Sequence, residues 1–81
     1  MLELILQFHQ DEEILKADGF DDAVVGIDYQ SNRLIYSVKK MIRVLVKDGM
    51  THEEAMEYLD YNVLGAYVGE KTPIYCYDYY A

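Results

Sequence analysis

The sequence predicts an α+β fold: a small, three- to four-stranded, mainly antiparallel sheet with an α-helical hairpin, about residues 38–47 and 52–67, packed on one face. Short runs rich in β-branched and aromatic residues indicate the strands, and two stretches with apolar residues at helical spacing indicate the hairpin. Strands and helices do not alternate strictly along the chain, which favours α+β over α/β. A chain of 81 residues is expected to form a single domain, residues 1–81, with a small core.

The N-terminal residues have a period-two pattern. Every second residue from Leu2 to Phe8 is apolar, with Glu3 and Gln7 between them, which predicts a strand. A helix over residues 1–16 is the alternative, because Leu and Glu are good helix formers. Residues 11–17 are predicted to form a short helix that has acids in its first turn and Gly19 as its stop.

The next segment predicts a strand and a turn. Residues 23–28 are a compact β-branched run, and the polar residues 30–32 form the turn after it. Residues 34–36 are either a second strand that closes a hairpin or the start of the next helix. Ser31 and Ser37 compete as the N-cap of that helix, and Ser37 is preferred because Leu-Ile-Tyr suits a strand.

A basic helix is predicted over residues 38–47, ending at Asp48-Gly49. Its apolar side chains fall within about 140° of arc. The candidate basic face opposite them consists of Lys39, Lys40, Arg43 and Lys47. The net charge of −8 is segmented, since residues 33–47 hold five bases and no acid while the flanking segments are strongly acidic. The basic face is therefore expected to pair with acidic neighbours or with an outside partner.

An acidic helix is predicted over residues 52–67. Thr51 and Glu54 form a capping-box sequence, with Thr51 as the N-cap and Glu54 at N3. The solvent side carries Glu53, Glu57 and Asp60. The link to the preceding helix is short, which predicts an antiparallel hairpin. Gly69 is the predicted C-terminal stop, and Pro73 cannot continue a helix.

Tyrosine is over-represented near the C-terminus. Residues 74–80 alternate with period two, which predicts a final strand on which Tyr75, Tyr77 and Tyr79 share a face as a candidate aromatic surface. Tyr58 and Tyr61 lie away from the apolar stripe of their helix. Because tyrosine joins a large apolar body to a polar tip, these residues either cover a thin core or form an assembly or partner surface.

The composition excludes several classes of protein. Eleven aromatic residues argue against disorder, and a single cysteine argues against a disulfide scaffold or a zinc ribbon. The net charge of −8 is wrong for a chain that coats nucleic acid. The sequence has neither an eighteen-residue apolar run nor a signal-peptide pattern, so no membrane contact is expected and a cytoplasmic location is predicted.

No catalytic signature is visible. A zincin helix needs a second histidine four residues after His52, and position 56 is Met. Gly69-Glu70-Lys71-Thr72 lacks the adjacent Gly and Lys of a phosphate-binding loop. Cys76 is predicted to be a small core residue rather than a nucleophile. Catalytic residues, a metal and cofactors are therefore not expected.

One segment of the chain resembles a known protein family. It is residues 61–73, with the sequence Tyr-Asn-Val-Leu-Gly-Ala-Tyr-Val-Gly-Glu-Lys-Thr-Pro. With the upstream residues 22–27 and Tyr36-Ser37, they resemble a family of short bacteriophage and bacterial proteins of unknown function, which have an Asn-x-x-Gly-Ala-aromatic-Val-Gly-Glu-x-Thr-Pro signature. The resemblance covers roughly residues 14–77 and implies a phage-related context without an activity. Met41 departs from the relatives, which often have Cys there.

The same segment supplies a candidate interaction site or pocket: Asn62, Tyr67, Glu70 and Thr72. Asn62 could hydrogen-bond across the helix end, Gly69 could take a positive φ, and Thr72 could hydrogen-bond in the turn. Glu70 is the residue least required by folding. The alternative is that the segment is a rigid corner between helix and strand.

The functional prediction is a small non-enzymatic interaction or regulatory protein that forms a homo-oligomer and acts on a host or phage protein. One alternative is inhibition by DNA mimicry, with acidic side chains imitating phosphates at residues 11–13, 21–22 and 53–60. The other alternative is a small-ligand binder or enzyme that uses the corner at residues 62–73.

Overall fold

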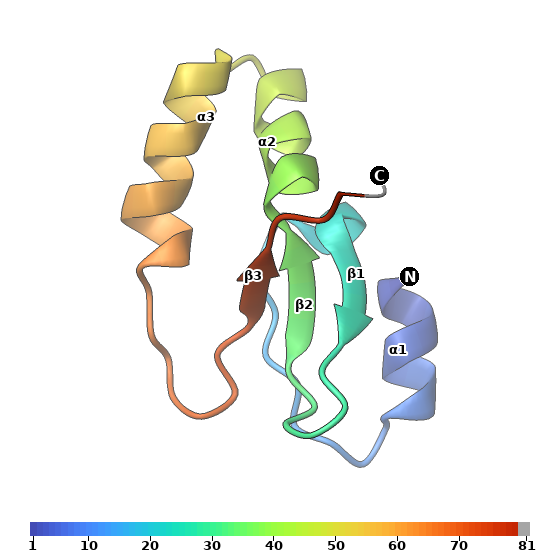
Figure 1. Ribbon diagram of the computed structural model, residues 1–81. Coiled ribbons are helices and arrows are strands. Elements are labelled where there is room, and N and C mark those ends of the chain that lie inside the picture. Colours follow the sequence, from blue (N-terminus) through green and yellow to red (C-terminus); the bar gives the residue numbers. More distant parts are fainter. Residues whose placement is uncertain (80–81) are drawn as a thin grey trace.

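A computed structural model describes residues 1–79 of the chain. It has an α+β fold with three α-helices and a three-stranded mixed sheet (Figure 1). In chain order the elements are α1 (Leu2–Phe8), the 3₁₀ turn η1 (Asp21–Ala23), β1 (Val24–Ile27), β2 (Leu34–Ser37), α2 (Val38–Lys47), α3 (His52–Leu59), the π-helical turn η2 (Asp60–Leu64) and β3 (Ile74–Cys76).

The sheet has the order β1-β2-β3. β1 and β2 form an antiparallel hairpin, with a register irregularity between Val24 and Gly26. β3 pairs parallel to β2, with Tyr36 opposite Tyr75. The parallel pair arises because the α2–α3 hairpin brings the chain back to the starting end of β2, which is the crossover that parallel neighbours require. The sheet is therefore half antiparallel, whereas the sequence predicted a mainly antiparallel one.

Of the two alternatives for the N-terminal residues, the strand is wrong and the helix is correct over part of its length, because the helix α1 covers Leu2–Phe8 and not residues 1–16. Ile5 interrupts the alternation, and the buried residues Leu2 and Ile5 have the i, i+3 spacing of a helix face. α1 lies beside β1 (Figure 1). This outcome removes the predicted fourth strand and leaves three.

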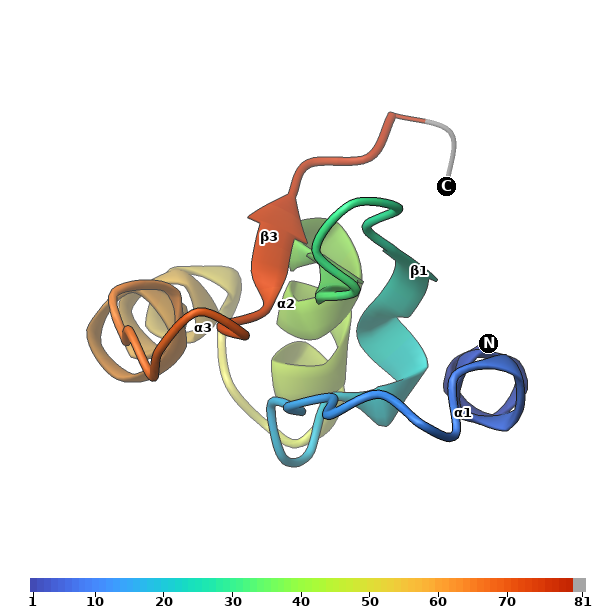
Figure 2. The same ribbon diagram turned by 90° about the horizontal axis from the view of Figure 1, so that it is seen from below.

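The predicted helix at residues 11–17 is also absent. The segment between α1 and η1 runs across one face of the sheet without regular structure (Figures 1 and 2). Ile14 and Ala17 pack against the core, and the Ala17 N–H donates to the Tyr36 hydroxyl at 2.8 Å. This bond and these contacts outweigh the helix-favouring acids of the sequence. Gly19 does have a positive φ, of 89°.

α2 has the predicted bounds. Ser37 ends β2 and caps α2, since its Oγ accepts from the Lys40 N–H at 3.2 Å. At the other end Gly49 has φ 110°, and the N–H groups of Gly49 and Met50 donate to the carbonyls of Val46 and Leu45. This pair of bonds is a Schellman motif, which explains why Asp48-Gly49 ends the helix.

α3 begins with the predicted capping box between Thr51 and Glu54. The helix is shorter than predicted: it changes to the π-helical turn η2 at Asp60 and ends at Gly65 instead of continuing to residue 67. Gly69, the predicted stop, lies in the following loop, where its φ of 112° makes a turn. The predicted C-terminal strand is also shorter, because β3 ends at Cys76; Tyr80 lies outside the described residues.

The core lies between the buried face of β2 and the hairpin formed by α2 and α3. Leu34 and Tyr36 share one face of β2, and both are completely buried together with Met41 of α2 and Leu59 of α3. α2 leaves the end of β2, and α3 runs back alongside it (Figure 1). This arrangement places the loop after α3 next to the sheet and next to the segment before η1 (Figure 2).

Candidate functional site

The loop between η2 and β3, residues 65–73, is a hydrogen-bonded corner. The hydroxyl of Thr72, a residue that is only 9% exposed, accepts from the Val68 N–H at 2.9 Å and donates to the Gly69 carbonyl at 2.7 Å. Gly69 has the positive φ that its place in the sequence predicted. The two hydrogen bonds of the Thr72 hydroxyl stabilise the turn. The sequence predicted that Thr72 would hydrogen-bond at this position.

Two cations fasten the corner to the β1–β2 turn. Arg33 Nη1 donates to the Thr72 carbonyl at 3.2 Å, and Lys71 Nζ donates to the Ser31 carbonyl at 2.9 Å. The turn is itself organised by Asp28, whose Oδ2 accepts from both the N–H and the hydroxyl of Ser31. These bonds from Ser31 lower the pKa of the Asp28 carboxyl. These hydrogen bonds therefore hold the corner at residues 65–73 and the β1–β2 turn together.

A cavity of about 250 Å³ lies between this corner and residues 16–20. Its walls are mainly aromatic and aliphatic, with Phe20, Tyr58 and Tyr75 contributing rings. Of the four predicted pocket residues, Asn62 and Thr72 line the cavity. Tyr67 and Glu70 do not line it, and both side chains are exposed. Two of the four predicted residues therefore line the cavity, and two do not.

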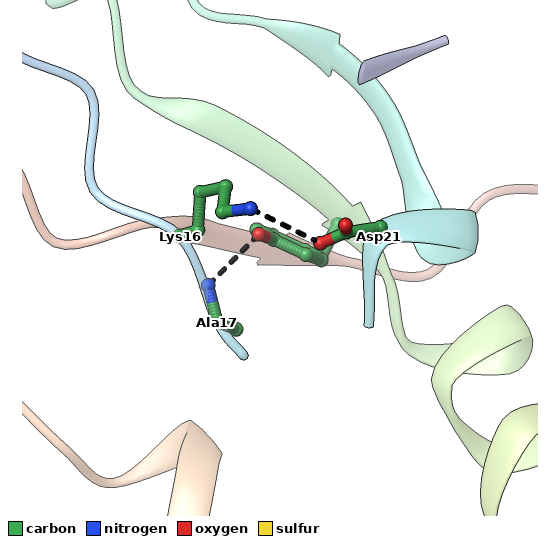
Figure 3. Close-up of polar contacts among 4 residues, drawn as sticks. Lys16, Ala17 and Asp21 are labelled. Carbon is green, nitrogen blue, oxygen red and sulfur yellow. Dashed lines mark hydrogen bonds and ion pairs between the residues drawn. The ribbon is translucent and has the colours of Figure 1, made fainter. Parts of the chain in front are cut away.

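Polar groups of the residues that line the cavity bond to other groups of the protein. Asn62 Nδ2 donates to the Tyr58 carbonyl at 3.1 Å, which is the bond across the helix end that the sequence predicted. Lys16 Nζ lies 3.7 Å from Asp21 Oδ1, and beside this pair the Ala17 N–H donates to the Tyr36 hydroxyl (Figure 3). These bonds position the cavity wall against the sheet.

Tyr75 lines the cavity and packs against Tyr36, which is completely buried and does not line it. The rings of Tyr36 and Tyr75 are tilted against each other, with centroids 5.9 Å apart. Burial raises the pKa of both phenols. Both therefore stay protonated at neutral pH, and the lining residue Tyr75 adds a neutral phenol to the aromatic walls, a combination suited to a small planar ligand.

The predicted basic face divides in two. Lys40, Arg43 and Lys47 surround a hollow of about 230 Å³, together with Val44 of α2 and Asp22 of η1. Lys39 lies to one side, with Nζ 5.0 Å from the centre of the Tyr79 ring. Within residues 1–79 the only ion pair closer than 4.0 Å is the one between Lys16 and Asp21. The basic and acidic helices therefore do not neutralise each other.

The structure separates the three tyrosines of the predicted aromatic surface. Tyr75 is half-buried and packs inward against Tyr36. Tyr77 and Tyr79 follow the end of β3 and are 54% and 83% exposed. β3 ends because the chain turns to place the Asp78 carboxylate on the Ser37 hydroxyl, where it accepts a hydrogen bond. Tyr75 is thus a core residue, and the exposed aromatic rings are those of Tyr77 and Tyr79.

One exposed apolar surface was missed by the sequence prediction. Met1, Leu4 and Phe8 are 70%, 58% and 74% exposed. Met1 is the N-cap of α1, and at 100° per residue the three side chains lie within about 60° of arc around the helix axis. The signal was present in the sequence, because a helical interpretation of residues 1–8 leaves more apolar side chains than one buried stripe can hold.

Other features add no further site. Cys76 is a free, half-buried thiol on β3. Over the described part of the chain, no three His, Cys, Asp or Glu side chains gather in a way that could hold a metal ion. Among residues 1–79 there is also no helix with the length and apolar character needed to cross a bilayer.

Comparisons with known proteins give no relative. No protein-family model, curated protein or solved structure matches this chain.

Proposed function

We propose that this protein is a small, non-enzymatic protein–protein interaction module that self-associates and acts on a host or phage protein in the cytoplasm. The exposed apolar face of α1, formed by Met1, Leu4 and Phe8, carries this proposal. The signature-like segment at residues 61–73 supports the phage-related context through its resemblance to short phage proteins.

The α1 face is an unusual use of apolar residues for a chain of this size. Apolar side chains cover about 200° of the helix circumference, yet only Leu2 and Ile5 are buried against the rest of the molecule. Grouped apolar side chains at a surface mark an interaction site more often than scattered ones do. A partner that covers Leu4 and Phe8 would remove this surface from water.

The test is affinity capture with matched variants. The tagged wild-type protein, the double variant Leu4→Glu/Phe8→Glu and the control Tyr29→Glu are expressed in infected cells, and the captured proteins are compared by quantitative mass spectrometry. Tyr29 is 96% exposed in the β1–β2 turn, so its variant changes an exposed aromatic residue far along the chain from α1. Circular dichroism verifies that all three proteins fold.

We expect one protein to be captured by the wild type and the Tyr29 control and lost from the α1 double variant. Binding of that protein, once purified, should show the same order of affinities in a direct titration. Equal capture by all three proteins, or capture of nothing above background, would contradict the proposal.

A small-ligand binder is the second candidate function, and the cavity of about 250 Å³ favours it. Its three aromatic rings suit a planar aromatic ligand. The chain has no tryptophan, so added indole can be excited selectively and its anisotropy followed. A rise in anisotropy with wild type that is lost in Ala66→Phe, which narrows the cavity, would support this function; unchanged anisotropy with wild type would remove it.

A further inference from the structure

We infer that the basic hollow on α2 binds the acidic face of α3 of a second copy, so that the copies associate head to tail. This inference rests on the self-association in the proposed function and assigns the interface to α2 and α3. It concerns a surface separate from the apolar face of α1.

The basic hollow is formed by three cations on one side of α2. Lys40, Arg43 and Lys47 fall within about 60° of arc, opposite the buried residues of the helix. Apolar area is also present, because Val44 lines the hollow. None of the three cations has an ion-pair partner within 4.0 Å among the described residues. The hollow can therefore accept carboxylates.

The acidic face of α3 has matching dimensions. Glu53 and Glu57 of α3, together with Asp60, its C-cap and the first residue of η2, are exposed and lie within about 60° of arc, on the side away from the buried Ala55 and Leu59. The first and last acids are seven positions apart in the sequence, as are the first and last cations, and seven steps of helix rise about 10.5 Å. Three carboxylates of one copy can thus face three cations of another. This complementarity of charge and spacing identifies a second copy as the occupant.

The two faces point in different directions on one molecule. α3 lies on one side of α2, whereas η1, which contributes Asp22 to the hollow, lies on the other side, in both views (Figures 1 and 2). A copy therefore cannot satisfy its own hollow with its own acidic face. Contact between two different faces is heterologous, so each copy binds one neighbour at each face and the assembly grows with concentration or closes as a ring.

Long-range charge opposes the association and short-range charge favours it. Each copy carries a net charge of −8, but at physiological ionic strength the screening length is about 8 Å. Ion-pair contacts at the interface are shorter than this length, so they are screened less than the repulsion between more distant charges. The carboxylate of Asp22 in the hollow opposes any anionic occupant, and the net charge of −8 opposes a nucleic acid most strongly, because its phosphates carry a denser negative charge than one acidic helix.

Two complementary variants test the interface. Arg43→Gln/Lys47→Gln removes cations from the hollow and leaves the acidic face intact, while Glu53→Gln/Glu57→Gln removes acids from α3 and leaves the hollow intact. Glutamine keeps a high helix propensity in both. Glu12→Gln/Glu13→Gln is the control, because it removes the same number of acids from residues outside α3. Sedimentation velocity over a range of concentrations gives the mass, and circular dichroism verifies folding.

We expect the average mass of wild type and control to rise with concentration, and each interface variant to associate about tenfold more weakly, as the loss of two surface ion pairs implies. An equimolar mixture of the two interface variants should recover association and stop at a 1:1 complex, since it contains one intact hollow and one intact acidic face. Added salt should weaken the association of the wild type.

Other outcomes separate the inference from the proposed function. Self-association of wild type that both interface variants retain would overturn the interface and leave the self-association in place. A monomer at every concentration would overturn both. Binding of duplex DNA by wild type that Arg43→Gln/Lys47→Gln loses would assign the hollow to phosphate and overturn the inference.

Discussion

The N-termini of α2 and α3 use the same chemistry in opposite surroundings. Ser37 Oγ accepts from the Lys40 N–H at 3.2 Å, and Thr51 Oγ1 accepts from the Glu54 N–H at 3.1 Å. Ser37 is completely buried, whereas Thr51 is exposed. The second hydrogen bond at each cap also differs: Ser37 donates to Asp78, 41 residues away, and Glu54 accepts from the Thr51 N–H, three residues away.

This difference separates a local cap from a tertiary one. The Thr51 box satisfies backbone donors of one helix and acts on that helix alone. Ser37 is at once the last residue of β2, the cap of α2 and the anchor of the segment after β3. Loss of the Ser37 hydroxyl should therefore reach three elements, and loss of the Thr51 hydroxyl only one.

The largest effect is expected for Ser37→Ala. The variant removes the cap of α2 and the buried donor to Asp78, and we expect the free energy of unfolding to fall by about 2 kcal/mol, within a range of roughly 1–3 kcal/mol. Urea unfolding followed by circular dichroism measures the change. A loss no greater than that of Thr51→Ala would contradict the tertiary role of Ser37.

Thr51→Ala should cost less, about 1 kcal/mol, which is the typical value of an N-cap at a solvent-exposed helix end. The loss should be confined to α3. Hydrogen exchange of backbone amides should accelerate in the first turn of α3 and stay unchanged in β2 and β3, whereas Ser37→Ala should accelerate exchange in both strands. Uniform acceleration in the Thr51 variant would contradict this local assignment.

The two caps also explain what the sequence could predict. Both capping residues and the bounds of α2 follow from signals within a few residues. The strand predicted at 23–28, which the structure places at Val24–Ile27, and the β2–α2 junction follow from equally local patterns. These signals agree with the tertiary structure, so the α+β class was predicted correctly. Asp78 bonding to Ser37 depends on a sequence separation that no local pattern encodes.

The wrong predictions have the same origin. In α1 one residue, Ile5, distinguishes a helix face from a strand, and the choice depends on what β1 offers for packing. Residues 11–17 have helical signals, but the Tyr36 hydroxyl competes for the Ala17 N–H from the sheet. At the candidate site, Asn62 and Thr72 were found through their turn chemistry, whereas Phe20 and Tyr58 reach the cavity only through tertiary packing.

Asp78→Asn should have a smaller effect than Ser37→Ala, because an asparagine carbonyl still accepts from the Ser37 hydroxyl. The hydrogen bond from Ser37 lowers the pKa of the Asp78 carboxyl in the folded protein. A carboxyl with a lowered pKa stabilises the fold above the pKa of about 3.9 of an unfolded aspartate, and this stabilisation is lost as the pH falls through the folded value.

The difference in stability between wild type and Asp78→Asn should therefore be largest near neutral pH and shrink below about pH 4. Comparing the two proteins by urea unfolding at matched pH cancels the titration of the other carboxylates. A difference that stays constant from neutral to acid pH would show that the charge of Asp78 contributes nothing to the bond.

Glu54→Gln should have the smallest effect of the four, because glutamine also completes a capping box and the site is exposed. The hydrogen bonds with Thr51 lower the pKa of Glu54, so the sign is the same as for Asp78: the stabilisation is present above the pKa of about 4.3 of an unfolded glutamate and is lost at lower pH. The two carboxylates should differ in how many elements they affect. Protonation of Asp78 should also accelerate backbone hydrogen exchange in β2 and β3, whereas protonation of Glu54 should accelerate it only in the first turn of α3. If both protonations accelerated exchange over equally many elements, the buried Ser37 cap would have no wider effect than the exposed Thr51 cap.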